Sequence, residues 1–335
     1  IFLSVLQMEQ MTKKYAVISV FISLLDCLFI YVFIYLLKGD VFVRFFVLLF
    51  CNIIGLSFLV YNTRVYFSKP KMSCLREMKS FMSFCFPSMI LPVVSWILSS
   101  SDKILLSKLQ NLNSLGVYAL AGTLSQVLSI LYLSFNTAYT PIFYSTYEKR
   151  DKIRRIQSTF ICFFCISLMA YLVCIRYFFP FFIHKQAYES SLQYFHLFCV
   201  GTLFSAFSSM NISYLAYAYK SKLILLITVC TSVVNIVVNY FMIKNFGPMG
   251  AVVASTCSMF LQMIVAYLFA IHYGYNGWIW KEVGPFGVLV GAFCIGYQFN
   301  SLIAMIGLFL FGVVLFLYFN GAFIRKLLGR KTIRA

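Results

Sequence analysis

The chain of 335 residues is strongly apolar and strongly basic: 62% of its residues are hydrophobic, 11% are charged, and the formal net charge is +18. Soluble domains carry about 25% charged residues, so this composition excludes an ordinary soluble enzyme or binding domain. The mean hydropathy of +0.89 agrees with that exclusion. The composition therefore indicates a membrane protein.

Ten apolar runs account for most of the sequence. A helix needs about 20 apolar residues to cross about 30 Å of hydrocarbon, and most of the runs supply that length. The last two are short and are separated by Gln298, Asn300 and Ser301. We therefore expect an all-α, polytopic transmembrane bundle with spans at 14–37, 41–61, 81–106, 115–145, 156–183, 192–217, 223–243, 248–271, 285–298 and 302–320.

The positive charge is distributed unequally between alternate loops. One set of loops, with the C-terminal tail, holds twenty Lys and Arg residues at 13–14, 64–79, 149–155, 220–222, 281 and 325–334. The other set holds five: Lys38, Arg44, Lys108, Lys185 and Lys244. This asymmetry predicts that the basic loops and the C-terminus are cytoplasmic. A nucleic-acid partner is not expected, because such a protein gathers its charge on a folded domain.

An internal repeat predicts the domain organisation. Shifting the chain by 208 residues places Lys14 on Lys222 and Gly39 on Gly247, and it aligns span 41–61 with span 248–271. Parallel repeats of helix bundles are common in secondary transporters. The chain begins with Ile1 in what resembles the end of a helix. We therefore expect that the sequence is N-terminally truncated and that four helices, on the order of 140 residues, precede it.

Five regions follow from this repeat. Residues 1–61 are expected to supply the last two helices of an N-terminal lobe, and 62–80 a basic cytoplasmic linker. Residues 81–271 are expected to form a six-helix C-terminal lobe, 272–320 two additional helices, and 321–335 a basic cytoplasmic tail.

The sequence contains no motif that indicates a metal, a cofactor or ATP hydrolysis. All cysteines except Cys74 lie in apolar runs, and the pair Cys162 and Cys165 has neither a second pair nor a nearby histidine. Such cysteines are typical of helix cores. A phosphate-binding G-x4-G-K-[ST] loop is also missing from the sequence. We expect no cofactor, no metal and no enzymatic activity.

Three patches resemble one transporter family. The first runs Pro87-x4-Pro92-x3-Trp96-x5-Asp102-Lys103, through Ser114-Leu115-Gly116-Val117-Tyr118-Ala119, to Pro141-x2-Tyr144. The second is Asn235-x3-Asn239 followed by Gly247-Pro248-Met249-Gly250-Ala251, and the third is Gln7-Met8-Glu9-Gln10. Together they resemble the polysaccharide (O-antigen repeat unit) flippases of the multidrug/oligosaccharidyl-lipid/polysaccharide exporter superfamily. Lys103 departs from the family pattern, in which arginine is commoner.

The resemblance implies a two-lobe fold that works by alternating access. It implies a substrate made of oligosaccharide linked to undecaprenyl diphosphate, in the bacterial inner membrane, for O-antigen, lipopolysaccharide or capsule synthesis. It also implies contact with membrane lipids and partnership with a polysaccharide polymerase and a chain-length regulator.

Several motif residues have structural interpretations of their own. Pro87 and Pro92 each remove a backbone hydrogen bond, so they mark either a hinge beside a cavity or a static kink. Asn235 and Asn239 lie one turn apart and either join helices by hydrogen bonds or contact a ligand. Further structural positions are Asp102, Pro141, and the glycines Gly247 and Gly250, which suit a tight turn and close helix approach.

Ionisable residues inside the spans are the candidates for substrate binding, because charges at membrane depth usually face a cavity. Asp26 lies near the predicted midplane. Arg44, Lys103 and Arg176 lie toward the predicted external ends of their spans, where they either face the cavity or snorkel to the interface. Polar Gln126 and Asn136 on span 115–145 complete the candidate set.

Two other function classes are compatible with a polytopic membrane protein. A cation-coupled drug exporter of the same fold would favour acidic cavity walls, whereas basic residues outnumber the single deep acid here. A membrane-embedded polysaccharide polymerase would favour carboxylates or a long interfacial loop, and the loop at 62–80 has Glu77 as its one acidic residue.

Overall fold

The computed structural model describes residues 12–32, 46, 49–50, 52–57, 60–61, 74–182, 190–275, 280–299 and 301–329. These residues form α-helices and short turns, with no β-strand among them. The chain divides into two units: Ile1–Met78 with Thr137–Ser145, and Lys79–Asn136 with Thr146–Ala335.

In the first unit, helix α2 (Thr12–Ile30) packs against a helical segment at 52–57. A Cβ atom placed on Gly55 would lie 3.0 Å from Cδ1 of Ile22, so the two helices approach closely at this glycine. The rings of Phe29 and Phe50 meet edge to face, with centroids 5.9 Å apart. The spans expected at 14–37 and 41–61 are thus neighbours where they are described.

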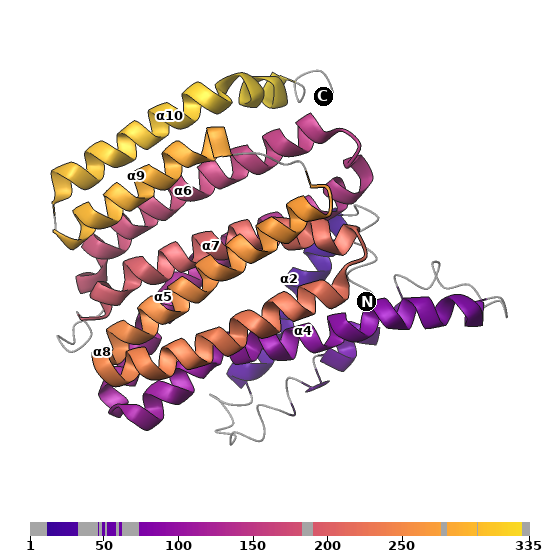
Figure 1. The fold of residues 1–335 in the computed structure, drawn as a ribbon, viewed down its shortest axis with the longest axis horizontal. Helices are drawn as coiled ribbons and strands as arrows, with labels where there is room; N and C mark the ends of the chain where they lie inside the picture. Colours follow the sequence, from indigo (N-terminus) through magenta and orange to yellow (C-terminus); the bar gives the residue numbers. More distant parts are fainter. Residues whose placement is uncertain are drawn as a thin grey trace. The chain divides into compact units, whose positions relative to one another are not determined.

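The second unit is an array of long helices (Figure 1). They are α4 (Cys74–Leu109), α5 (Leu112–Thr146), α6 (Arg150–Phe182), α7 (Ser191–Tyr217), α8 (Ser221–His272), α9 (Trp280–Gln298) and α10 (Leu302–Gly329), of which α4 and α5 extend into both units. Helix α8 packs along α7, and α6 packs against α7, α9 and α10. A core of aromatic and aliphatic side chains joins α5, α6, α7, α9 and α10.

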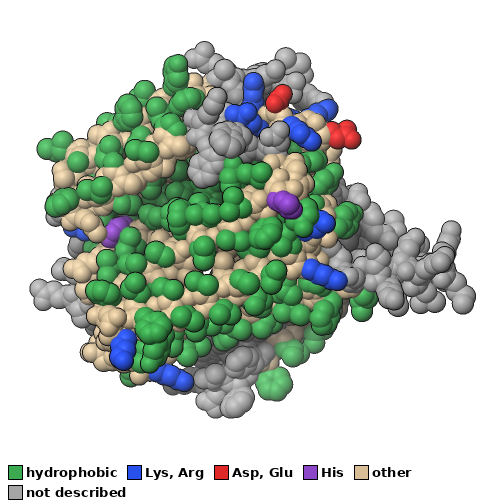
Figure 2. Space-filling view, viewed as in Figure 1, with side chains coloured by type: hydrophobic (Ala, Val, Ile, Leu, Met, Phe, Trp, Pro, Cys, Tyr) green, Lys and Arg blue, Asp and Glu red, His purple; other side chains and the backbone are tan. Residues whose placement is uncertain are grey.

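Among the described residues, six helices are long and apolar enough to cross a membrane, and Ala16–Ile30 and Val283–Gln298 are shorter apolar helices. One of the six, α8, covers two of the expected spans. The helices lie close to the predicted runs, although α4 begins before residue 81 and α10 continues past residue 320. The protein is therefore an all-α, multi-pass membrane protein. Figure 2 shows hydrophobic side chains over most of the visible face, with a few Lys and Arg side chains toward its edges.

Helix α8 folds back on itself at Gly247. This residue has φ 58° and ψ −140°, a conformation that glycine adopts without steric cost. A Cβ atom on Gly250 would lie 2.1 Å from the carbonyl oxygen of Met242, so the backbones touch there. Both ends of α8 meet the end of α7: Lys220 N donates to Leu215 O (2.9 Å), and the Tyr214 hydroxyl donates to Tyr273 O (2.6 Å).

The predicted proline positions lie inside continuous helices. Pro87 and Pro92 are in α4, and Pro141 is in α5. Pro87 and Pro141 are buried, whereas Pro92 is exposed.

Candidate functional site

A buried carboxylate connects three helices of the second unit. Asp102 on α4 is 5% exposed. Its carboxylate accepts hydrogen bonds from the hydroxyl of Tyr118 on α5 and from Oγ of Ser255 on α8 (3.4 Å). The backbone N–H of Lys103 donates to Oδ1 of Asp102 (2.7 Å). A buried charge is costly unless it is hydrogen-bonded, so these three donors account for the position of Asp102.

A second polar group lies on the first arm of α8, which is the part before Gly247; the second arm is the part after it. Oδ1 of Asn235 accepts hydrogen bonds from Oγ of Ser101 on α4 (3.0 Å) and from Nδ2 of Asn239 (2.9 Å). Both asparagines are buried, and Oδ1 of Asn239 has no hydrogen-bond partner among the described residues. The predicted one-turn spacing therefore produces an amide pair that ties α8 to α4.

A polar cavity of about 260 Å³ adjoins both groups, between α4, α5, α7 and α8. Lys103, which is half-buried, is one of the residues that line it. The polar side chains that line the cavity with Lys103 are Ser99, Asp102, Ser125, Gln126, Ser129, Tyr132, Thr202, Ser205, Asn235 and Ser255. Leu98, Gly122, Phe198 and Met259 complete the wall. The site thus gathers hydroxyl and amide side chains beside one acid and one base.

The structure brings together two of the six predicted substrate-binding residues, Lys103 and Gln126. Asn136, farther along α5, accepts a hydrogen bond from Oγ of Ser213 (3.4 Å) and does not line this cavity. Asp26 belongs to α2, but its side chain lies outside the described residues. Arg44 is also outside them.

Arg176 lies in a different cluster, between α6, α7 and α9. Its guanidinium carbon is 4.9 Å from the ring centroid of Tyr297, a cation–π distance. The Tyr297 ring lies 5.3 Å from the ring of His196, which is 3% exposed. Arg176 therefore interacts with an aromatic neighbour instead of lining the polar cavity.

Two residues important to the site were not predicted for it. Tyr118 appeared in the sequence only as part of the Gly-x-Tyr pattern, and Ser255 had no signal at all. Both roles depend on the rotation of α5 and α8 about their axes, which hydropathy does not specify.

In the described part of the chain, no group of three or more His, Cys, Asp or Glu side chains is placed so that it could hold a metal ion.

Comparisons with known proteins identify the fold. A crystal structure of MATE in the straight conformation superposes with a TM-score of 0.68 at 15% sequence identity, covering 81% of this chain and 65% of that one. A structure of MATE in complex with MaL6 gives a TM-score of 0.67, also at 15% identity, with the same coverage. An outward-facing multidrug resistance MATE family transporter of the MOP superfamily gives 0.59 at 15% identity, covering 78% of this chain and 62% of that one.

The chain thus spans slightly less than two thirds of the length of these transporters, and its fold is similar to theirs. Residues 1–147 match the model of a family described as polysaccharide biosynthesis protein. No curated protein matches the chain.

Proposed function

We propose that this protein is a flippase that moves lipid-linked oligosaccharide repeat units across the bacterial inner membrane. The match of residues 1–147 to a family described as polysaccharide biosynthesis protein carries the proposal, because it favours a polysaccharide substrate over the drugs of MATE exporters with a similar fold. The substrate is undecaprenyl-diphosphate-linked, and the product feeds O-antigen or capsule assembly together with a polymerase and a chain-length regulator.

The polar cavity supports this substrate class. Sugars present hydroxyl groups, which pair with the serine, threonine and amide side chains of the wall. The Lys103 ammonium suits a phosphate oxygen, since lysine binds phosphate as a point charge. The carboxylate of Asp102 is already engaged by Tyr118 and Ser255, so it offers little to a cationic drug.

The mechanism is alternating access, in which two lobes rock about a central passage. Charged and hydroxyl groups shield the sugar–phosphate head, and the polyprenyl tail stays in the bilayer. In this arrangement the basic loops and the C-terminus are cytoplasmic.

Replacing Lys103 tests the proposal. In cells that lack the gene, Lys103→Gln should transport about ten- to hundred-fold less than the natural protein, the loss expected for one charge-assisted hydrogen bond. Lys103→Arg should retain most activity. The matched control is Lys108→Gln, which removes the same charge from an exposed position of the same helix.

The readout is the amount of lipid-linked repeat unit that accumulates on the cytoplasmic leaflet, with surface polysaccharide as the second measure. If Lys103→Gln restores transport fully, the polar cavity is not the substrate-binding site. Deletion cells with normal polysaccharide and raised drug sensitivity would instead identify a drug exporter.

A further inference from the structure

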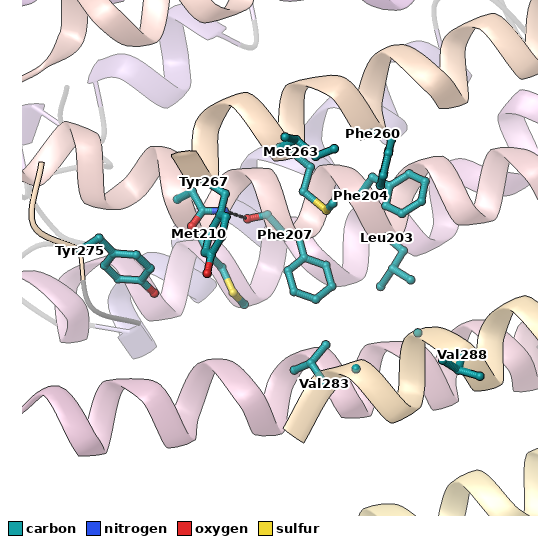
Figure 3. A pocket seen from close by; sticks show the side chains of 14 residues that line it. Leu203, Phe204, Phe207, Met210, Phe260, Met263, Tyr267, Tyr275, Val283 and Val288 are labelled. Atoms are coloured by element: carbon teal, nitrogen blue, oxygen red, sulfur yellow. Dashed lines mark hydrogen bonds between the residues drawn. The ribbon is translucent and has the colours of Figure 1, made fainter. Parts of the chain in front are cut away.

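A second, apolar cavity lies between α7, the second arm of α8 and α9, and it shares no residue with the polar cavity. We call it the apolar groove; its volume is about 430 Å³ (Figure 3). Leu203 and Met210 of α7 and Met263 of α8 form a buried floor. Phe260 and Val288, which are 44% and 76% exposed, lie where the groove opens to the surface.

Two glycines of α9 create the space. A Cβ atom on either Gly284 or Gly287 would have no neighbouring atom within 4 Å. Their missing side chains leave the α9 side of the groove unfilled between Val283 and Val288. Apolar cavities of this kind exclude water and bind apolar molecules. Helices α7 and α8 are long and apolar enough to cross a membrane and α9 is a shorter apolar helix, so the apolar molecule expected beside the groove is a hydrocarbon chain of the bilayer.

Beyond one end of the apolar groove lies a cluster of tyrosines with one lysine. Tyr275 lines this end and donates a hydrogen bond to Oε1 of Gln157 (2.6 Å). Its ring lies 4.9 Å from the ring of Tyr214, whose hydroxyl donates to Tyr273 O. Nζ of Lys220 lies 4.5 Å from the centroid of the Tyr273 ring. Burial raises the pKa of Tyr275, so its phenol remains a neutral donor.

We propose that the apolar groove holds one acyl chain of an anionic membrane phospholipid, with the headgroup at the Lys220 end. The charge complementarity between a lipid phosphate and Lys220 selects an anionic lipid. Tyrosines at this end match the aromatic side chains that occupy the headgroup level of membranes. A groove of this volume accommodates a single acyl chain, whereas a polyprenyl tail is far longer.

Photolabelling tests the proposal. The protein is reconstituted in vesicles of phosphatidylethanolamine and phosphatidylglycerol that contain phosphatidylglycerol with a photoactivatable acyl chain. We expect labelling concentrated on α7 and the second arm of α8, around Phe207 and Met263. Gly287→Leu should abolish this labelling, because its Cβ atom meets open space and the rest of the side chain would occupy the groove. Gly307→Leu on α10 is the matched control, since it too meets open space.

Two further comparisons in the same experiment identify the lipid. Phosphatidylglycerol should label more strongly than phosphatidylcholine carrying the same acyl chain, and Lys220→Gln should remove that preference. Val288→Trp narrows the groove from its exposed edge and replaces Gly287→Leu if that variant does not fold. Labelling unchanged by both groove variants overturns the proposal. Displacement of the probe by polyprenyl phosphate but not by unlabelled phosphatidylglycerol also overturns it, and assigns the groove to the substrate tail.

Discussion

At the scale of single residues, the hydroxyl of Tyr118 is the group whose removal should show how the Asp102 cluster is held together. Tyr118→Phe leaves a buried carboxylate with one fewer donor while keeping the ring in place. We expect a loss of about 1–3 kcal/mol in the free energy of unfolding. The measurement is the thermal unfolding midpoint of purified protein in detergent.

Tyr240→Phe provides the comparison for that loss, because Tyr240 is 43% exposed on α8. Its effect should stay within about 0.5 kcal/mol. Equal midpoints for the two variants would mean that the Tyr118 hydrogen bond adds nothing to the stability of the cluster.

The asparagine pair gives a second prediction at this scale. Asn235→Leu leaves the donors on Ser101 and Asn239 without their shared acceptor, whereas Asn239→Leu removes a residue that already has an unpartnered oxygen. We expect Asn235→Leu to be more destabilising, by about 1–2 kcal/mol. Thermal unfolding of the two single variants and the double variant measures this difference. The opposite order would contradict the hydrogen-bond pattern.

At the scale of elements, the fold-back of α8 depends on two glycines that act in different ways. Gly250→Ala places a methyl group against the carbonyl of Met242, so the arms must separate. Gly247→Ala meets no such contact but must adopt a strained φ, at a cost of about 1–3 kcal/mol. We expect Gly250→Ala to lower the yield of folded protein more strongly, as measured by gel filtration after detergent extraction.

Gly291→Ala on α9 is the matched change, because its Cβ meets open space within a helix. It should be neutral or stabilising by up to about 1 kcal/mol, since alanine is the better helix former. If all three variants extracted equally well, the close approach at Gly250 would have no role in folding.

At the scale of the whole molecule, the contacts among Tyr147, Tyr214 and Tyr273 place three turns at one end of the second unit. The turns between α5 and α6, between α7 and α8, and after α8 should therefore lie on one side of the membrane. Glu148→Cys and Lys222→Cys should react with an impermeant maleimide only after cells are permeabilised. Asn113→Cys, at the other end of α5, should react in intact cells.

The unsubstituted protein gives the background for this labelling, because its own cysteines lie mainly within the spans. Reaction of Lys222→Cys and Asn113→Cys from the same side would contradict the alternating topology.

Hydropathy predicted the helices because burial in lipid requires long apolar runs whatever the partners are. It also predicted the break between α9 and α10, where polar residues interrupt one run. The site was harder to predict. Asp102 and Asn235 lie far apart in the sequence, and their convergence on one cavity depends on how α4 and α8 are rotated. Arg176 shows the same limit: its place within an apolar helix could be predicted, but its contact with Tyr297 could not.

The reversal at Gly247 has a mechanical consequence. The first arm of α8 supplies Asn235 to the polar cavity, and the second arm supplies Ser255 to the same wall. Because the backbones touch at Gly250, the two arms would have to separate in order to slide past one another near the reversal. We therefore expect them to move together, as a single lever. A swing of that lever would displace Asn235 and Ser255 together, so the hydrogen bonds to Ser101 and Asp102 would break or form in concert.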